Sequence, residues 1–357
     1  MSYNLQLKNK ILLTGGGTGG SVTPLLAVAD EFGKEEFRYL WIGTRKGPEQ
    51  EMVKKEGIAF KRIASGKIRR YFSLRNLLAP LWVLIGFIQS FVIIIAFMPR
   101  WIISAGGFVS VPVVWAGWIL RRKILIHQQD VRAGLANKLM APFATAITTT
   151  FRKSLDDYGN KAVWVGNPTR IMNYELGIKN NKRFFNLKKN LPIVLIMGGG
   201  TGAKFINDLV LASIKELTEI CQIIHVTGKG KKLKMPAGVK NYNGYEFLQY
   251  EQMVEAYMRA NIVVSRCGLA TLTELSSLGK PSILVPMPNT HQVDNARLFE
   301  TENAAIVLDQ PVLEKEFFVQ KIGELLNDKK SQKELSENIS IVIKKQASKE
   351  LANIIKE

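Results

Sequence analysis

The chain has 357 residues, 46% of them hydrophobic, and a formal net charge of +19 at pH 7. This length and apolar content predict a globular protein with room for two domains, and argue against a low-complexity chain. The positive charge favours an anionic partner, which leaves nucleic acid, a membrane surface and phosphorylated substrates open. The two cysteines, Cys221 and Cys267, belong to no Cys/His cluster, which disfavours structural zinc and favours a reducing compartment.

A glycine-rich loop near the N-terminus is the first candidate site. Residues 11–32 read ILLTGGGTGGSVTPLLAVADEF, which predicts a strand, a turn with five glycines and a helix. Glycines let backbone N–H groups approach a ligand closely, and a helix N-terminus favours negative charge, so we expect the loop to bind phosphate. The acidic residue of a dinucleotide fingerprint and the lysine of a P-loop are both missing. The alternative is a plain tight turn.

Residues Leu77–Met98 form an apolar stretch of 22 residues, long enough for a transmembrane helix. It is preceded by the basic segment GKIRRYFSLR, with Lys67, Arg69, Arg70 and Arg75. That composition suits docking on an anionic bilayer, and Trp82 and Phe87 are candidate membrane contacts. A buried core helix and a true span are the alternatives. A span is disfavoured because it would separate two strands that we predict to belong to one sheet.

Short apolar, β-branched runs alternate with helix-like stretches along most of the chain. This βαβ order predicts parallel sheets with helices on both faces. The pattern restarts at Pro192–Ile214, PIVLIMGGGTGAKFINDLVLASI, where a strand again enters a glycine turn. We predict an N-terminal domain over residues 1–167 and a C-terminal domain over residues 168–340. A C-terminal helix over residues 341–357 is a candidate to pack back on the first domain.

Each predicted half therefore has a glycine turn at the carboxyl end of its first strand, where doubly wound folds bind ligands. One anion on each half indicates a reaction between two phosphorylated partners. A nucleotide sugar and a phospholipid-linked acceptor are such a pair.

Eight consecutive segments resemble the motifs of the MurG family, in order, over residues 10–310. They are GGGTGGSVTPLLAVA, WIGTRKGPEQEMV, GKIRRY, SAGGFVSVPVVWA, HQQDVRAGLANKLMA, VGNPTR, MGGGTGAKFIND and SRCGLATLTELSSLGKPSILVPMPNTHQVDNA. The resemblance implies the α/β GT-B fold, with two Rossmann-like domains facing a cleft. It also implies an inverting enzyme that moves GlcNAc from UDP-GlcNAc to the MurNAc 4-hydroxyl of lipid I, forming lipid II for peptidoglycan. Such an enzyme works as a peripheral protein on the cytoplasmic face of the plasma membrane.

The resemblance also implies roles for individual residues. The acceptor diphosphate would lie against Gly16, Gly17, Thr18, Gly19, Gly20 and Ser21, with Gly106 and Gly107 in a second turn. UDP-GlcNAc would contact Thr18, Gly19, Gly20, Asp130, Arg170, Gly199, Gly200, Thr201, Gly202, Leu269, Ala270, Glu274, His291, Gln292 and Asn295. Glu274 would accept hydrogen bonds from the ribose hydroxyls, the alternative being a first-turn glutamate favoured by the helix dipole. UDP-GlcNAc is a substrate, and we expect no cofactor and no metal.

The chain departs from the family pattern at chemically important positions. Ser21 replaces the usual histidine of the first loop, and the usual H-E-Q-N becomes His127, Gln128, Gln129 and Asp130. The hydroxyl of the donor loop moves to Thr201. Serine is a poor base at neutral pH, so we hypothesise that His127 or Asp130 takes the acceptor proton. The alternative for His127 is a structural histidine at the end of a buried strand.

Other functions remain open at this level. The same fold serves glycosyltransferases with another acceptor or sugar, UDP-GlcNAc 2-epimerases, and proteins that bind nucleotide sugars without turnover. The basic, membrane-suited flank disfavours an epimerase. A nucleic-acid binder is disfavoured because the basic residues form no recognisable recognition helix or aromatic platform. The sequence does not decide the oligomeric state.

Overall fold

The computed structural model describes residues 10–17, 19–33, 36–66, 79–170, 184–200 and 202–356. It divides into two compact units. Unit 1 extends to Thr169 and includes Lys344–Glu357, and unit 2 is Arg170–Ile343. The predicted site residues Thr18, Thr201, Lys67, Arg69, Arg70 and Arg75 lie outside the described residues.

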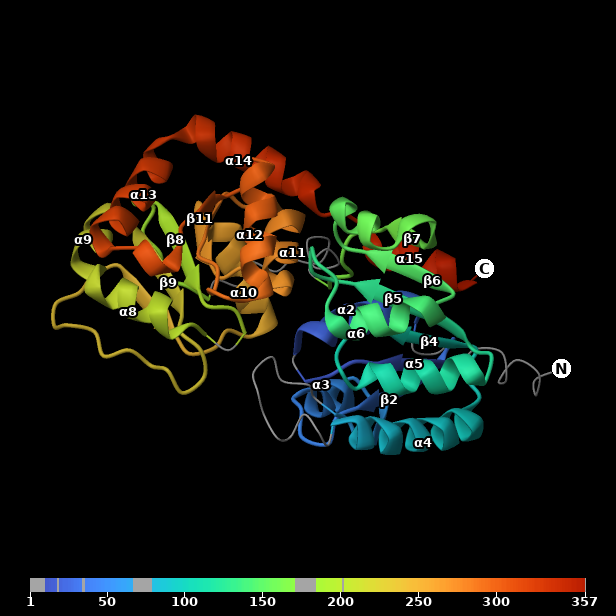
Figure 1. Cartoon of the computed structure of the whole chain (residues 1–357). Coiled ribbons are helices and arrows are strands. Elements are labelled where there is room, and N and C mark those ends of the chain that lie inside the picture. Colours follow the sequence, from blue (N-terminus) through green and yellow to red (C-terminus); the bar gives the residue numbers. More distant parts are fainter. Residues whose placement is uncertain are drawn as a thin grey trace. The chain divides into compact units, whose positions relative to one another are not determined.

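Unit 1 contains one parallel sheet of seven strands in the order β3-β2-β1-β4-β5-β6-β7 (Figure 1). The inner strands are buried apolar runs, as parallel strands covered on both faces must be. The strands are β1 Lys10–Thr14, β2 Arg38–Gly43, β3 Ala59–Arg62, β4 Trp101–Ser104, β5 Lys123–Gln128, β6 Ala146–Thr149 and β7 Ala162–Trp164.

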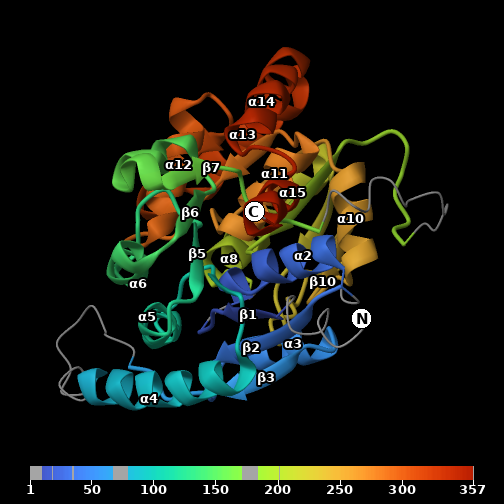
Figure 2. The ribbon, with the colours of Figure 1, turned by 90° about the vertical axis from the view of Figure 1, so that its right-hand side faces the viewer.

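Helices cover both faces of this sheet (Figures 1 and 2). On one face lie α2 Thr23–Phe32, α3 Glu49–Lys55 and α15 Ala347–Lys356. On the other lie α4 Ala79–Phe97, α5 Ser110–Ile119 and α6 Leu135–Met140. The C-terminal helix α15 packs against α2, so the two ends of the chain contribute to one hydrophobic core.

The helix α4 is the long apolar stretch of the sequence. Ile94 is fully buried, and Gly86 lies so close to Ala64 that a Cβ at Gly86 would be 2.1 Å from the Ala64 oxygen. The strands before and after α4 belong to the same sheet, so α4 is a crossover helix packed on that sheet. This arrangement contradicts the spanning alternative. Phe87 packs partly against the core and keeps part of its surface exposed, and its membrane contact stays a prediction.

Unit 2 repeats the architecture with a parallel sheet of six strands in the order β10-β9-β8-β11-β12-β13. Its strands are β8 Ile193–Met197, β9 Gln222–Val226, β10 Tyr242–Tyr245, β11 Ile262–Ser265, β12 Ser282–Leu284 and β13 Ile306–Val307. Its helices are α8 Lys204–Ala212, α9 Ile214–Ile220, α10 Tyr250–Arg259, α11 Leu269–Leu278, α12 His291–Thr301, α13 Lys315–Asn327 and α14 Lys329–Val342.

Both sheets reverse their strand order beside the first strand, between β1 and β4 in unit 1 and between β8 and β11 in unit 2. The crevice outside the carboxyl ends of strands at such a point is where doubly wound folds bind ligands. Both glycine loops follow the first strand of their sheet and therefore lie at these positions. The predicted fold class, two Rossmann-like parallel-sheet domains, is confirmed.

Candidate functional site

The first glycine loop, residues 15–21, is held by contacts to its carbonyl groups. The indole Nε1 of Trp41 donates to the Gly15 oxygen at 3.1 Å, and the amide of Gln129 donates to the Gly20 oxygen at 3.1 Å. Gln129 follows β5, so the loop after β5 lies beside the glycine loop. These contacts bring two of the predicted segments of unit 1 together.

Gly17 has a φ of 88°, a conformation that favours glycine. Its N–H donates to Glu49 Oε2 at 3.3 Å and so points into the protein. We predicted that this N–H would bind the acceptor diphosphate, and the observed contact corrects that detail. Ser21 is buried, with 7% of its surface exposed.

The second glycine turn packs directly on the first. Gly107 has a φ of 94°, and a Cβ at this position would lie 2.8 Å from the Gly16 oxygen. The neighbouring Gly106 donates its N–H to Ser104 Oγ at 3.1 Å and accepts from Ser110 Oγ at 3.0 Å. The two turns therefore form one surface at the carboxyl ends of β1 and β4.

Gln128 organises the loop that carries Asp130. Its Nε2 donates to the carbonyl oxygens of Asp130 at 2.7 Å and Arg132 at 3.1 Å. Its Oε1 accepts from Asn137 Nδ2 at 2.6 Å and from the hydroxyl of Tyr158 at 2.8 Å. The buried amide thus fixes the backbone around the half-buried Asp130.

His127 is completely buried. Its Nδ1 lies 3.0 Å from Thr148 Oγ1, and its Nε2 lies 3.0 Å from Asn167 Oδ1 and 3.3 Å from Thr150 Oγ1. Burial lowers the pKa of His127 to about 4, against the smaller raising effect of Asn167. With both ring nitrogens occupied and no exposed surface, this geometry corrects the idea that His127 takes a substrate proton, and favours the structural alternative.

In unit 2, the second glycine loop leaves space for a ligand. Among the described residues, a Cβ at Gly199 or Gly200 would have no neighbour within 4 Å, whereas one at Gly202 would lie 2.0 Å from the Thr227 oxygen. Gly202 also accepts a hydrogen bond from Lys231 Nζ at 3.4 Å. The loop is therefore packed at its end and open in its middle, beside a lysine.

Glu274 lies in the second turn of α11, which rules out its first-turn alternative. The buried hydroxyl of Tyr257, on α10, donates to Glu274 Oε2 at 2.7 Å. Burial raises the pKa of Glu274 to about 7, partly offset by the hydrogen bond from Tyr257. The carboxyl group thus keeps one oxygen fixed by Tyr257 and is poorly solvated.

The remaining predicted donor residues lie around the starts of α11 and α12. Leu269 and Ala270 are the first two residues of α11, where backbone N–H groups have no partner within the helix. Asn295 is buried and its Nδ2 donates to the Cys267 oxygen at 3.4 Å, which connects the two helix starts. His291 is exposed, whereas Gln292 accepts from the Met287 N–H at 3.1 Å.

Arg170 is half-buried at the first position of unit 2. The segment between Arg170 and the donor loop includes residues 171–183, which the structure does not describe. Within the described part of the chain, no group of three His, Cys, Asp or Glu side chains is placed to hold a metal ion.

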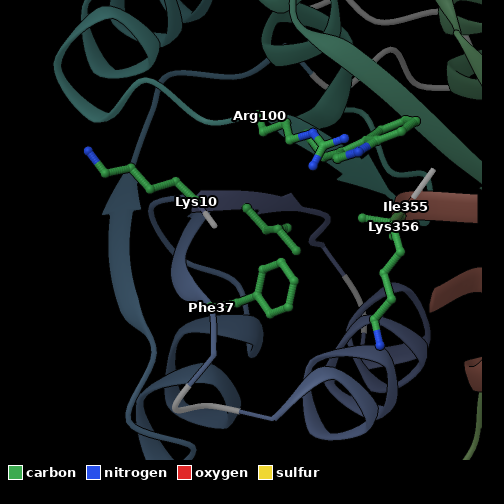
Figure 3. Close-up of a pocket in the computed structure, with 7 residues that line it drawn as sticks. Lys10, Phe37, Arg100, Ile355 and Lys356 are labelled. Atoms are coloured by element: carbon green, nitrogen blue, oxygen red, sulfur yellow. The ribbon is translucent and has the colours of Figure 1, made fainter. Parts of the chain in front are cut away.

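A cavity of about 140 Å³ lies elsewhere in unit 1, at the amino ends of β1 and β4 (Figure 3). Lys10 and Lys356 contribute side chains to its wall, but their ammonium groups point away from it and lie 5.7 Å from the Phe97 ring and 6.0 Å from the Phe32 ring. The cavity is at the amino ends of the strands, whereas the glycine loops are at their carboxyl ends. It is therefore separate from the candidate site.

Three functional candidates were not singled out in the sequence. In the sequence, Glu49 has the pattern of an ordinary acidic residue in a first helical turn. Tyr257 has the pattern of an ordinary core aromatic residue, and Asn137 that of an ordinary helix residue. The signal for Glu49 is its position after WIGTRKGP, a glycine- and proline-containing turn that follows a strand. Only the fold shows that these side chains contact the predicted site.

Two glycine-rich turns at the switch points of two doubly wound sheets, with a buried carboxyl group on the helix after β11, are typical of a nucleotide-sugar enzyme of the GT-B class. Residues 11–149 match the glycosyltransferase family 28 N-terminal domain, and residues 193–354 match its C-terminal domain. The chain belongs to glycosyltransferase family 28 and, within it, to the MurG family.

Two relatives carry the name UDP-N-acetylglucosamine–N-acetylmuramyl-(pentapeptide) pyrophosphoryl-undecaprenol N-acetylglucosamine transferase. The Clostridium tetani protein is 36% identical over 90% of this chain and 91% of its own length. The Legionella pneumophila (strain Paris) protein is 34% identical over 97% of this chain and 96% of its own length.

Solved structures share the fold. The crystal structure of Acinetobacter baumannii MurG has a TM-score of 0.78 at 23% identity and covers 98% of this chain and 99% of its own. A UDP-GlcNAc 2-epimerase from Neisseria meningitidis has a TM-score of 0.71 at 14% identity and covers 98% of this chain and 100% of its own. At these identities the likeness is one of fold alone.

Proposed function

We propose that this protein transfers GlcNAc from UDP-GlcNAc to lipid I and forms lipid II, as the names of its relatives describe. The observation that carries the proposal is the whole-length relationship at 34–36% identity, together with a glycine turn at the switch point of each sheet. The epimerase alternative is disfavoured because those structures share only 12–14% identity with this chain.

Unit 1 would bind the acceptor diphosphate at the surface formed by its two glycine turns. Gly106 and Gly107 adopt positive φ values there, and Gly19 and Gly20 precede the start of α2. Backbone N–H groups and a helix N-terminus stabilise a diphosphate without a bound cation. Gly17 supports this surface from behind, through its bond to Glu49.

Unit 2 would bind UDP-GlcNAc. The open turn at Gly199 and Gly200 suits the diphosphate, and the first N–H groups of α11 add favourable charge. Glu274 would accept hydrogen bonds from the ribose hydroxyls with the oxygen that Tyr257 leaves available. Asn295 would hold the loop after β11 in place for the sugar.

In the reaction, the MurNAc 4-hydroxyl oxygen forms a bond to the anomeric carbon of GlcNAc while the bond from that carbon to the UDP oxygen breaks. The electron pair of the broken bond leaves with UDP, and the configuration inverts. Asp130 is our candidate to take the hydroxyl proton, because its carboxylate lies in the loop that Gln128 fixes and Gln129 ties to the glycine loop.

Membrane docking is proposed for the outer face of α4. Leu84, Ile88 and Val92 recur every four residues on this face and are each more than 50% exposed. Trp82 and, on α5, Trp118 are exposed too. An apolar helix face preceded in sequence by basic residues suits the surface of an anionic bilayer, which would place the protein at the cytoplasmic face of the plasma membrane.

The test is to incubate the purified protein with labelled UDP-GlcNAc and a short-chain lipid I analogue, and to measure labelled lipid and free UDP. Equal amounts of the two products are expected. UDP release without labelled lipid would refute the proposed acceptor, and binding of UDP-GlcNAc without turnover would indicate a protein that only binds the nucleotide sugar.

A further inference from the structure

The buried carboxylate of Glu49 is the feature that the proposed chemistry does not use. Glu49 is the first residue of α3 and none of its surface is exposed. An acidic side chain is costly to bury unless several hydrogen-bond donors compensate it. Its position directly behind the first glycine loop suggests what it does there.

Three donors surround this carboxylate. Thr44 donates to Oε1 through its N–H at 2.7 Å and also through its hydroxyl, and Gly17 donates its N–H to Oε2 at 3.3 Å. Both oxygens are therefore used as acceptors. Glu49 thus joins the turn after β2 to the glycine loop after β1.

The neighbouring glycines make room for this carboxylate. A Cβ at Gly16 would lie 2.4 Å from Glu49 Oε1, and a Cβ at Gly47 would lie 1.8 Å from Glu49 Oε2. These two positions are therefore glycine for a steric reason, to admit an acidic side chain, independently of any ligand.

The bond to Gly17 fixes the orientation of one peptide group. In a trans peptide the carbonyl and the N–H point in opposite directions, so an inward Gly17 N–H turns the Gly16 carbonyl the other way. That side is where Gly107 packs without a Cβ, close to the Gly16 oxygen. The peptide between Gly16 and Gly17 is thus held on its N–H side by Glu49 and on its carbonyl side by the second turn.

We propose that Glu49 is a positioning residue for acceptor binding, which sets the glycine loop of unit 1 in the conformation that receives the lipid diphosphate. It acts through Gly17 and does not touch the substrate. The inference rests on the proposed function for the identity of the acceptor. It predicts a larger effect on the acceptor than on UDP-GlcNAc, because Gly199, Gly200, Glu274 and Asn295, which are proposed above to bind UDP-GlcNAc, belong to unit 2.

The main test is Glu49→Gln. The single oxygen of glutamine can keep both Thr44 donors, but its NH₂ group then faces the Gly17 N–H, donor against donor. We expect the KM for a short-chain lipid I analogue to rise about tenfold, and the KM for UDP-GlcNAc to stay within about twofold of the wild-type value. Glu51→Gln is the matched control, because Glu51 lies on the same helix with its side chain 76% exposed beside Lys55.

Gly47→Ala provides a second variant in case Glu49→Gln does not fold, since the added methyl group displaces the carboxylate without changing its charge. A folded variant with both KM values unchanged, or with both raised equally, would overturn the inference. Calorimetric titration with the lipid I analogue measures the change in acceptor affinity without turnover. If the wild-type protein makes no labelled lipid, the proposed function fails. An active wild type with no selective effect refutes the role of Glu49 only.

Discussion

The buried side-chain amide of Gln128 donates to two carbonyl oxygens and accepts from two donors. A glutamate at this position has no N–H to offer the carbonyl oxygens of Asp130 and Arg132, and its charge would repel them. Gln128→Glu should therefore displace the loop that carries the proposed base and lower kcat about tenfold or more.

Turnover at saturating concentrations of both substrates measures this effect. Gln50→Glu is the control, because Gln50 lies near the surface and its amide oxygen accepts from Arg62 Nε at 2.9 Å, a contact that a carboxylate keeps. A folded Gln128→Glu protein with wild-type kcat would show that the amide is not needed to hold Asp130.

Glu274 has a pKa raised from 4.5 to about 7 by burial. Between these pH values the folded protein keeps a proton that the unfolded chain releases, so the free energy of unfolding falls as the pH rises through this window. Glu274→Gln removes the ionisation. We expect its Tm to exceed that of the wild type by about 2–4 °C at pH 8 and to match it near pH 4.5.

The same substitution should weaken the binding of UDP-GlcNAc, about tenfold at pH 8, because the acceptor for the ribose hydroxyls loses its charge. Wild-type affinity should fall as the pH decreases below 7 and the carboxylate becomes protonated. Calorimetric titrations at pH 6 and 8 measure both effects. Unchanged affinity in the variant would remove Glu274 from the ribose site.

At the scale of elements, the inner strands were predictable and the edges were not. Runs such as KILLT and IVLIM are apolar throughout because both sides of a central parallel strand are buried. The strands β3, β7, β10 and β13 are the edge strands of the two sheets. Each is partly exposed. β3 (AFKR) and β10 (YNGY) contain charged or polar residues, and β7 and β13 are only three and two residues long.

The same reasoning explains the site. Glycine loops were recognisable because their composition is unusual, and the structure places them at the switch points. The role of each side chain could not be recognised in the sequence. His127 and Asp130 are close in sequence but differ in burial, because His127 lies near the end of a buried strand and Asp130 lies in the loop beyond it. Whether a titratable group meets solvent or substrate is decided by packing between distant segments.

The outer face of α4 should bind membranes independently of the catalytic chemistry. Replacing Ile88 and Val92 together with aspartate puts two charges on that face while the buried Ile94 remains. Binding to vesicles with anionic lipids should fall at least about tenfold, since each apolar side chain that enters the interface contributes on the order of 1 kcal/mol or more.

A flotation assay measures vesicle binding, and UDP-GlcNAc titration confirms that unit 2 is intact. Val312→Asp is the control, because Val312 is 78% exposed and belongs to unit 2, whereas α4 belongs to unit 1. Equal flotation of the double variant and the control would exclude this face as the docking surface.

At the scale of the whole molecule, the chain completes unit 1 only after it has completed unit 2, because α15 returns to pack on α2. Leu351 and Ile355 are buried in the same core as Val28 and Phe32. Leu351→Asp places a charge in this core and should cost unit 1 about 3 kcal/mol or more, a large part of the 5–15 kcal/mol that stabilises a typical domain. Asn353→Asp, at an exposed position of the same helix, is the matched control.

In calorimetry, UDP-GlcNAc should mark the transition of unit 2 by raising its Tm. We expect Leu351→Asp to lower the other transition and to leave the marked one in place. A single transition that shifts as a whole would mean that the two units unfold together and that α15 stabilises both.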